Sequence, residues 1–207
     1  FIDDYIAICF VLGNDFIPHS LTLDLRHKGI ENIINFYLHG FYNFKKNLVS
    51  PTGKVDEDFF RFIIKKISES EDHIVSNLRK TRERMRPRAG DYTNSDPRDN
   101  EYQRRLDVIN NLPITDRQTR ESEKTIGLGT KGWRERYYDK TMGFSSNEDT
   151  EECVYEYLRG LKWAHLYYYK GCASHNWYYP YLYAPTFRDI YLYLEKNRYN
   201  DLTFQKG

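Results

Sequence analysis

The sequence has little cysteine, little net charge and no long apolar run. Its 207 residues include three cysteines, far apart and without Cys-x-x-Cys spacing, which argues against a zinc site and fits a reducing compartment. The net charge of +1 excludes a generally basic nucleic-acid-binding chain, so any such contact must come from local patches. No apolar stretch is long enough to cross a bilayer, and no membrane partner is expected. We expect an intracellular protein, cytoplasmic or nuclear, with the cytoplasm favoured.

Aromatic residues, in contrast, are abundant. The chain contains 19 Tyr, 12 Phe and 3 Trp. Such rings pack protein cores, and they also form surfaces on which nucleic-acid bases stack. The length allows one or two domains with a core. The chain starts at Phe1, inside an apolar run and without an initiator Met, which we interpret as the start of a piece cut from a longer protein.

Apolar residues that recur at helical spacing predict a mainly α chain. In the stretch that starts at Asp56, Ile63 and Ile67 fall on one face, as in a helix that packs against a core. Residues 1–12 are mostly apolar and are expected to be buried, with Asp3 or Asp4 as a helix cap. The predicted helices cover residues 24–39, 56 into the eighties, 150–170 and 187–198.

Three segments interrupt the helical pattern. Residues 41–55 contain Pro51 and Gly53 and predict a short hairpin or loop. Residues 88–131 are polar and predict a partly mobile linker, with one short helix near 102–109 and a flexible glycine-rich end at 127–132. Residues 171–185 cannot form a regular helix, because they contain glycine and two prolines. The predicted organisation is therefore 1–87, the linker 88–131, and 132–207.

The first candidate site is a turn at the end of the N-terminal apolar segment. Gly13 and Asn14 would form this turn and hold Asp15 at the rim of the core, aimed into a cleft. Such a carboxylate suits Mg²⁺ or Mn²⁺, and phosphodiester hydrolysis often uses two such ions. The alternative, favoured on this motif alone, is that Asp15 caps the next turn. His19 would either order the turn, its commoner role, or assist a phosphate.

The second candidate site is the aromatic segment, residues 167–185. Its density of rings on irregular backbone favours a platform for single-stranded nucleic acid, on which each stacked base contributes about 1–3 kcal/mol. The alternative is a loop held to the core by aromatic packing, and most of these rings are expected to pack there. Trp177, His175 and Tyr178 are the candidates to face a substrate.

A weaker candidate is the arginine-rich end of the helix that starts at Asp56. Arg82 and Arg84 would follow a phosphate backbone. A solvated helix end, stabilised by the helix dipole, explains the same residues and is slightly favoured.

Three motifs in order along the chain resemble the XRN family of 5′→3′ exoribonucleases. They are DDYIAICFVLGNDFIPHSLTLDLR at residues 3–26, GWRERYY at 132–138, and the segment 155–185 that contains LRGLKWAHLYYYKGCASHNWYYPYLYAP. The resemblance implies the C-terminal part of the first conserved region followed by the second conserved region. It also implies a larger α/β core, related to flap endonucleases and PIN nucleases, with a more helical second region.

The same resemblance implies an activity and roles for two residues. The family hydrolyses RNA with a 5′-monophosphate, one nucleotide at a time, using a divalent metal. By position, Asp15 is similar to the last of the family's acidic metal ligands, which would make it both catalytic and metal-binding. Trp177 falls in the segment where family members stack the leading bases. Two positions depart from the pattern, since the family usually has Trp where His175 stands and His where Leu182 stands.

The family's other acidic ligands and its pocket for the 5′-phosphate lie before the region that this chain covers. We therefore expect single-stranded RNA and an N-terminal nuclease half of the same protein as partners, and no activity from this chain alone. Two alternatives remain from the sequence. One is a catalytically inactive RNA-binding or scaffold module, and the other is a flap-endonuclease-like enzyme that acts on DNA.

Overall fold

A computed structural model of the chain describes residues 1–23, 28–84 and 125–204, with the side chains of 81–84 excepted. Within these ranges the regular structure is helical, and pairing between extended segments is limited to one isolated antiparallel bridge between Val49 and Val55. This confirms the mainly α prediction. The predicted helix near 102–109 and most of the predicted linker lie outside the described residues. The helices are α1 (Ile2–Phe10), α2 (Gly29–Phe44), α3 (Glu57–Arg84), α6 (Trp133–Met142), α7 (Asn147–Lys170) and α8 (Phe187–Lys196), followed by the short 3₁₀ helix Tyr199–Asp201.

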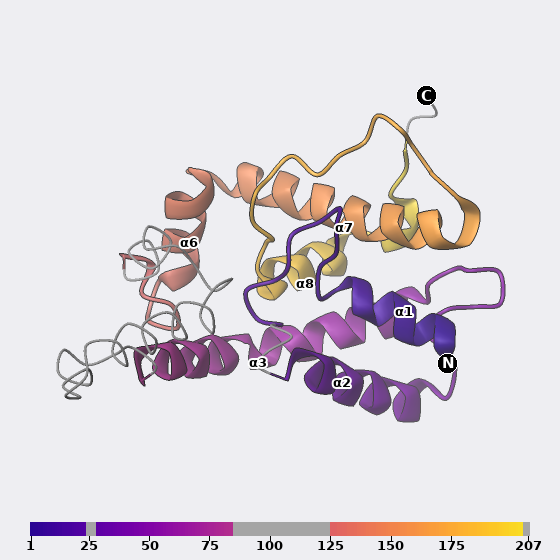
Figure 1. Cartoon of the computed structure of the whole chain (residues 1–207), viewed down its shortest axis with the longest axis horizontal. Coiled ribbons are helices and arrows are strands. Elements are labelled where there is room, and N and C mark those ends of the chain that lie inside the picture. The colour runs from indigo at the N-terminus through magenta and orange to yellow at the C-terminus, as the bar shows by residue number, and fades with distance from the viewer. Residues whose placement is uncertain (24–27, 85–124, 205–207) are drawn as a thin grey trace, which may run out of the picture.

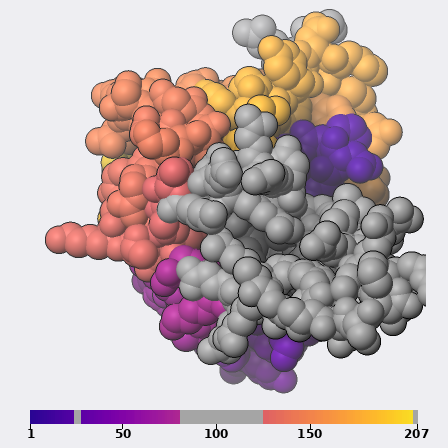
Figure 2. All heavy atoms as spheres, turned by 60° about the vertical axis from the view of Figure 1, so that its left-hand side comes forward, coloured from indigo at the N-terminus to yellow at the C-terminus, as the bar shows by residue number. Residues whose placement is uncertain are grey.

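The two long helices, α3 and α7, lie on either side of α8 (Figure 1). Helix α2 packs on α3, and α1 packs on both α2 and α7, so the first and last parts of the sequence share one core. Helix α6 lies at one end of the molecule (Figure 1). In the space-filling view, indigo atoms of the N-terminal segment border orange atoms of the C-terminal region (Figure 2). Segments far apart in the sequence thus meet at the surface.

Helices α3, α7 and α8 follow from periodicity and from capping residues. The apolar stripe of α3, which includes Ile63 and Ile67, is buried, as predicted. Helix α7 begins after Ser146, whose hydroxyl accepts from the amide of Asp149 in a capping box. Helix α8 begins after Thr186, whose side chain accepts from the amide of Asp189.

Helix α2 extends beyond its predicted end, into residues 41–44 that we assigned to a loop or hairpin. The cause is aromatic packing, since Phe44 stacks on Phe59 of α3 with 5.3 Å between ring centroids. Gly40 makes this approach possible, because a methyl group there would overlap the Phe59 ring. The hairpin-like part of the prediction survives only around the bridge between Val49 and Val55.

The predicted capping role of Asp3 and Asp4 is wrong, since the N-cap of α1 is Phe1 without a side-chain hydrogen bond. Asp4 is buried and accepts hydrogen bonds from the Tyr37 hydroxyl at 2.6 Å and the Val49 amide at 2.7 Å. Asp3 accepts from the hydroxyl of Tyr169 at 2.9 Å. Both carboxylates tie α1 to distant segments, which a reading of local sequence does not reveal.

The end of the predicted linker is packed rather than loose. Ile126 and Leu128 are buried in a second apolar cluster with Trp133 and Val75. The carbonyl of Gly129 accepts a hydrogen bond from Ser76 in α3 at 3.3 Å. The interpretation of 127–132 as a flexible segment is therefore corrected, because two apolar side chains among its polar neighbours anchor it to α3.

Candidate functional site

The turn after α1 is closed by its own backbone and by Asn14. Gly13 has φ +102°, and a methyl group on it would lie 2.5 Å from the Cα of His19. The Asn14 side-chain oxygen accepts from the amides of Phe16 at 2.8 Å and Ile17 at 3.2 Å. Asn14, rather than its neighbour, is therefore the residue that caps this turn.

This arrangement leaves Asp15 exposed at the tip of the turn. Within the described residues no hydrogen bond or ion pair engages its carboxylate, so the capping alternative has no contact in its support. His19 is also exposed. Its backbone, through the close approach to Gly13, helps to shape the turn, while its role toward a phosphate stays a prediction.

Both candidate sites meet at Gly160 in α7. A methyl group there would overlap Cγ2 of Ile17, from the turn, and would lie 2.9 Å from Cη2 of Trp177, from the aromatic segment. Only glycine allows both side chains to approach the helix this closely. The helix thereby joins two motifs that are 160 residues apart in the sequence.

Four aromatic side chains beside the turn form a continuous group, here called the ring cluster: Phe16, Trp163, Tyr167 and Trp177. Phe16 meets Trp163 edge-on at 4.7 Å between centroids. Trp163 stacks on Tyr167 at 5.2 Å and meets Trp177 at a tilt, with 5.8 Å between centroids. Phe16 and Tyr167 are exposed, whereas Trp163 is buried. Sequence reasoning missed Phe16, although it directly follows Asp15, and so did not predict that an exposed ring follows the exposed carboxylate in the chain.

Trp177 is half-buried and held in place. Its Nε1 donates to Glu156 at 2.8 Å, and the other oxygen of Glu156 accepts from Arg159 at 2.6 Å. His175 and Tyr178 lie on either side of it along the chain and are exposed. Trp177 is thus held in place, whereas the side chains of His175 and Tyr178 are exposed. Base stacking by any of these three residues stays a prediction.

Arg82 and Arg84 fall in the last turn of α3. Their side chains lie outside the described part of the chain. Contact between these arginines and a phosphate backbone therefore stays a prediction.

Helix α6 anchors the end of the aromatic segment. The Tyr137 hydroxyl donates to the carbonyl of Ala184 at 2.8 Å. The Tyr138 hydroxyl accepts from the amide of Thr186 at 2.9 Å and donates to Asp189 at 2.7 Å. The motif at 132–138 thus has a structural role that explains its tyrosines, because they fix the backbone that leads from the rings into α8.

A buried carboxylate that sequence reasoning missed connects these elements. Glu71 of α3 is 1% exposed and accepts from Arg134 of α6 at 2.8 and 3.2 Å. It also accepts from the amide of Phe187, at the start of α8, and from the hydroxyl of Thr22, in the segment after the turn. Burial raises the pKa of the Glu71 carboxyl, and Arg134 opposes that change. The sequence held one signal for this buried carboxylate, because Glu71 lies at helical spacing with the apolar residues of α3, four residues after Ile67.

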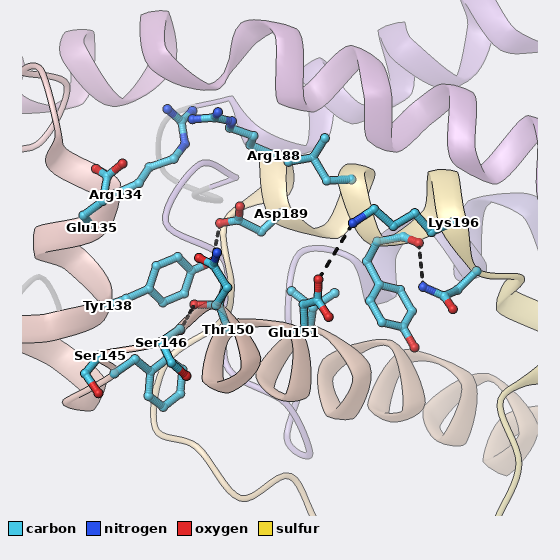
Figure 3. Close-up of a pocket in the computed structure, with 16 residues that line it drawn as sticks. Arg134, Glu135, Tyr138, Ser145, Ser146, Thr150, Glu151, Arg188, Asp189 and Lys196 are labelled. Carbon is cyan, nitrogen blue, oxygen red and sulfur yellow. Dashed lines mark hydrogen bonds and ion pairs between the residues drawn. The ribbon is translucent and has the colours of Figure 1, made fainter.

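A hollow of about 680 Å³ opens between α6, the start of α7 and α8 (Figure 3). Lys196 of α8 points across it toward Glu151 of α7, with 3.9 Å between the charged atoms. Its wall also carries Arg134 and Arg188. The predicted site residues with described side chains do not line it, so this hollow is separate from the turn and the ring cluster.

Asp15 does not belong to a complete metal site within the described ranges. These ranges contain no group of three or more His, Cys, Asp or Glu side chains that could hold a metal ion. Asp15 could therefore supply one ligand to a metal whose other ligands come from elsewhere. The described helices also include none that is long and apolar enough to span a membrane.

Comparison with known proteins identifies the family. The family model described as the Xrn1 helical domain matches residues 1–124 and 113–207. The 5′-3′ exoribonuclease 2 homolog of Drosophila melanogaster and the 5′-3′ exoribonuclease 2 of Gallus gallus are each 26% identical over 91% of this chain, which spans 24% and 26% of their lengths. The 5′-3′ exoribonuclease 1 of Saccharomyces cerevisiae is 33% identical over 55% of this chain and 8% of its own. The chain belongs to the XRN family and contains its helical domain.

Proposed function

We propose that this chain forms one wall of a 5′→3′ exoribonuclease site in a longer protein, here called the parent, which degrades single-stranded RNA with a 5′-monophosphate. The observation that carries the proposal is that the exposed Asp15 directly precedes Phe16, the first ring of the ring cluster. The turn exposes a carboxylate, and the next residue, Phe16, begins a group of rings that leads to Trp177. A carboxylate beside stacking surfaces suits a phosphodiester flanked by bases.

The exposed and the buried side chains of the site would have different roles. Phe16 and Tyr167 are the accessible rings of the cluster, so they would contact bases, while Trp163 and the hydrogen bond between Trp177 and Glu156 would keep the wall rigid. His175 and Tyr178, which are exposed, would extend this contact along the RNA. Because stacking tolerates every base, such a wall suits an enzyme without strong sequence preference.

The chemistry requires groups from outside the described residues. Asp15 is one hard oxygen ligand, which suits Mg²⁺ or Mn²⁺. A single carboxylate does not hold two metal ions, so we propose that the N-terminal nuclease half of the parent supplies the other ligands and the pocket for the 5′-phosphate. Within residues 1–23, 28–84 and 125–204 no other side chains complete a metal site around Asp15.

The test compares the parent with the 207-residue chain. Each receives single-stranded RNA with either a 5′-monophosphate or a 5′-hydroxyl, and single-stranded DNA as a third substrate, with Mg²⁺. The proposal expects mononucleotide release by the parent from the 5′-monophosphate RNA, and no release by the chain alone.

Other outcomes point to the alternatives. If neither protein degrades RNA but both bind it, the chain is a binding or scaffold module. If the parent prefers DNA, the flap-endonuclease-like alternative holds. If the 207-residue chain alone releases nucleotides with Mg²⁺, the claim that its site is incomplete is wrong.

A further inference from the structure

A buried carboxylate lies behind the ring cluster. Glu156 of α7 is 9% exposed. Its Oε2 accepts a hydrogen bond from Nε1 of Trp177 at 2.8 Å, and its Oε1 accepts from Nη1 of Arg159 at 2.6 Å. A buried carboxylate loses its hydration, and apolar residues in place of such an ion pair are often as stabilising or more so. Stability alone therefore does not account for a carboxylate at this position.

The hydrogen bond from Trp177 to Glu156 restricts the orientation of the indole ring. An N–H group donates well only near the direction of its own bond, so a change of side-chain rotamer would break this hydrogen bond. The six-membered ring of the same side chain lies against Gly160, where a methyl group would be 2.9 Å from Cη2. A directional bond and a close contact thus hold Trp177 together.

The Glu156 carboxylate is held in turn by Arg159. The guanidinium carbon of Arg159 lies 5.3 Å from the ring centroid of Tyr155 and 5.2 Å from that of Phe204. Phe204 also meets Trp177 edge-on, with 6.0 Å between ring centroids. Arg159 therefore balances the charge of Glu156 from a fixed place, and the second carboxylate oxygen remains for Trp177.

From Trp177 the ring contacts lead to the accessible rings of the cluster. Trp177 meets Trp163 at 5.8 Å between centroids, and Trp163 contacts both Phe16 and Tyr167. Phe16 and Tyr167 are 42% and 46% exposed, whereas Glu156 and Trp163 are buried. Glu156 is thus placed to affect the exposed rings through Trp177, rather than to contact RNA itself.

We propose that Glu156 is a positioning residue, which sets the orientation of Trp177 and, through it, of the rings that stack on RNA. The inference rests on the proposed function for its ligand. A binding surface whose side chains are already held in one rotamer loses less entropy when the ligand binds. Loss of the Glu156 acceptor should therefore weaken RNA binding and leave the chemical step unchanged, since Glu156 takes no part in that step.

Two double variants of the parent isolate the acceptor. Glu156→Gln with Arg159→Met keeps an oxygen that accepts from Trp177, and Glu156→Ala with Arg159→Met removes it. Both lack the ion pair, and neither leaves an unpaired buried guanidinium. In steady-state degradation of 5′-monophosphate RNA with Mg²⁺, we expect the alanine variant to have a KM about fivefold higher or more, with the same kcat. The glutamine variant should keep the wild-type KM.

A second probe removes the donor instead of the acceptor. Trp177→Phe keeps an aromatic ring without an N–H group, so it should also raise KM with kcat unchanged. Addition of Glu156→Ala and Arg159→Met to Trp177→Phe should raise KM no further, because the bond is already absent. Full additivity of the two effects would show that Glu156 does not act through Trp177 and would overturn the inference.

Asp56→Ala controls for loss of stability alone. Asp56 pairs with Lys46 at 2.6 Å and accepts from the amide of Phe59 at 3.0 Å, and none of these residues belongs to the ring cluster. All variants are assayed at a temperature at which circular dichroism shows them folded. We expect Asp56→Ala to lower the unfolding midpoint and to keep the wild-type KM. A KM raised as much as in the alanine double variant would overturn the inference, because lost stability would then explain both.

The remaining outcomes separate this inference from the proposed function. Equal KM values for the two double variants in an active parent would overturn the role of Glu156 and leave the nuclease. If the parent binds RNA without degrading it, the nuclease proposal fails. Fluorescence anisotropy then decides the role of Glu156, which predicts a dissociation constant about fivefold higher, or more, in the alanine variant alone. If the wild-type parent does not bind RNA, both proposals are wrong.

Discussion

Arg134 donates two hydrogen bonds, at 2.8 and 3.2 Å, to the carboxylate of Glu71 in the interior of the molecule. This pair joins α6 to α3. The same carboxylate caps α8 through the amide of Phe187 at 2.8 Å. Since α6 and α8 flank the end of the aromatic segment, the pair determines where that segment enters the core.

Replacement of Glu71 by alanine is expected to destabilise the chain strongly. The change leaves a poorly solvated guanidinium on Arg134, with Asp72 as its remaining partner, and removes the acceptor of the Phe187 amide at the start of α8. Loss of one partner of a buried pair costs about 3–5 kcal/mol. The control is Glu69→Ala, which removes an exposed partner of Lys66 and should cost less than about 1 kcal/mol. Urea unfolding measures both. Equal losses for the two variants would show that the buried pair does not hold the helices together.

Gly160→Ala is expected to strain the junction of the two motifs. Overpacking of this kind costs about 1–3 kcal/mol, partly offset by about 1 kcal/mol from the better helix propensity of alanine. Because the new methyl group overlaps Ile17, the cost should shrink when Ile17→Ala is present. A double-mutant cycle by urea unfolding measures this. Additive losses would mean that Ile17 and Gly160 are not in contact.

Replacement of Tyr178 is expected to affect RNA binding alone, whereas replacement of Trp177 should affect both RNA binding and stability. Tyr178 is 74% exposed, so Tyr178→Ala should leave the unfolding midpoint unchanged and weaken RNA binding about fivefold or more through lost stacking. Trp177→Ala should lower both stability and affinity, since Trp177 also donates to Glu156. Leu182→Ala, at 85% exposure in the same segment, is the control. Fluorescence anisotropy with the parent measures binding, and wild-type affinity for Tyr178→Ala would remove Tyr178 from the RNA surface.

His165 is expected to make stability depend on pH. Burial lowers the pKa of its imidazole below 6.5, although Nε2 donates to the Gly53 carbonyl at 2.8 Å. Well above pH 6.5 the ring is neutral in both folded and unfolded states, so this group adds no pH dependence there. Below that pH the unfolded chain takes up a proton more readily than the folded chain, and stability falls.

His165→Gln keeps a donor for the Gly53 carbonyl and removes this titration. The loss of unfolding free energy between pH 7.5 and 5.5 should therefore be smaller in the variant than in the wild type. Chemical denaturation at the two pH values checks the difference. Identical pH dependence in both proteins would show that the folded state does not suppress protonation of His165.

Periodicity predicted α2, α3, α7 and α8, because burial of an apolar stripe is a property of one segment, but it did not predict α6. Helix α3 shows this, with Ile63 and Ile67 buried in register. Glu71 was missed although it occupies a position in this stripe, because its partners are supplied by α6 and α8. Which partner satisfies a buried charge depends on tertiary contacts, and a single sequence does not contain that information.

The sequence predicted the two parts of the candidate site but not how they come together. The exposed turn and the aromatic segment were both selected from the sequence, but their meeting on Gly160 was not, since it depends on how α7 packs. Local chemistry also misplaced the cap of the turn. Asn14 and Asp15 are both suited to cap it, and only the backbone geometry shows that Asn14 does so.

The most direct test of the account measures what Asp15 contributes to RNA degradation in the parent. Asp15→Asn preserves size and removes the charge, and Asp139→Asn, on the exposed side of α6, is the control. Loss of groups that merely support a metal ligand costs 10- to 100-fold, so loss of a ligand should cost about 100-fold or more. The account predicts that loss for Asp15→Asn, with Asp139→Asn unchanged, in mononucleotide release from 5′-monophosphate RNA. Equal rates for both variants and the wild type would contradict it.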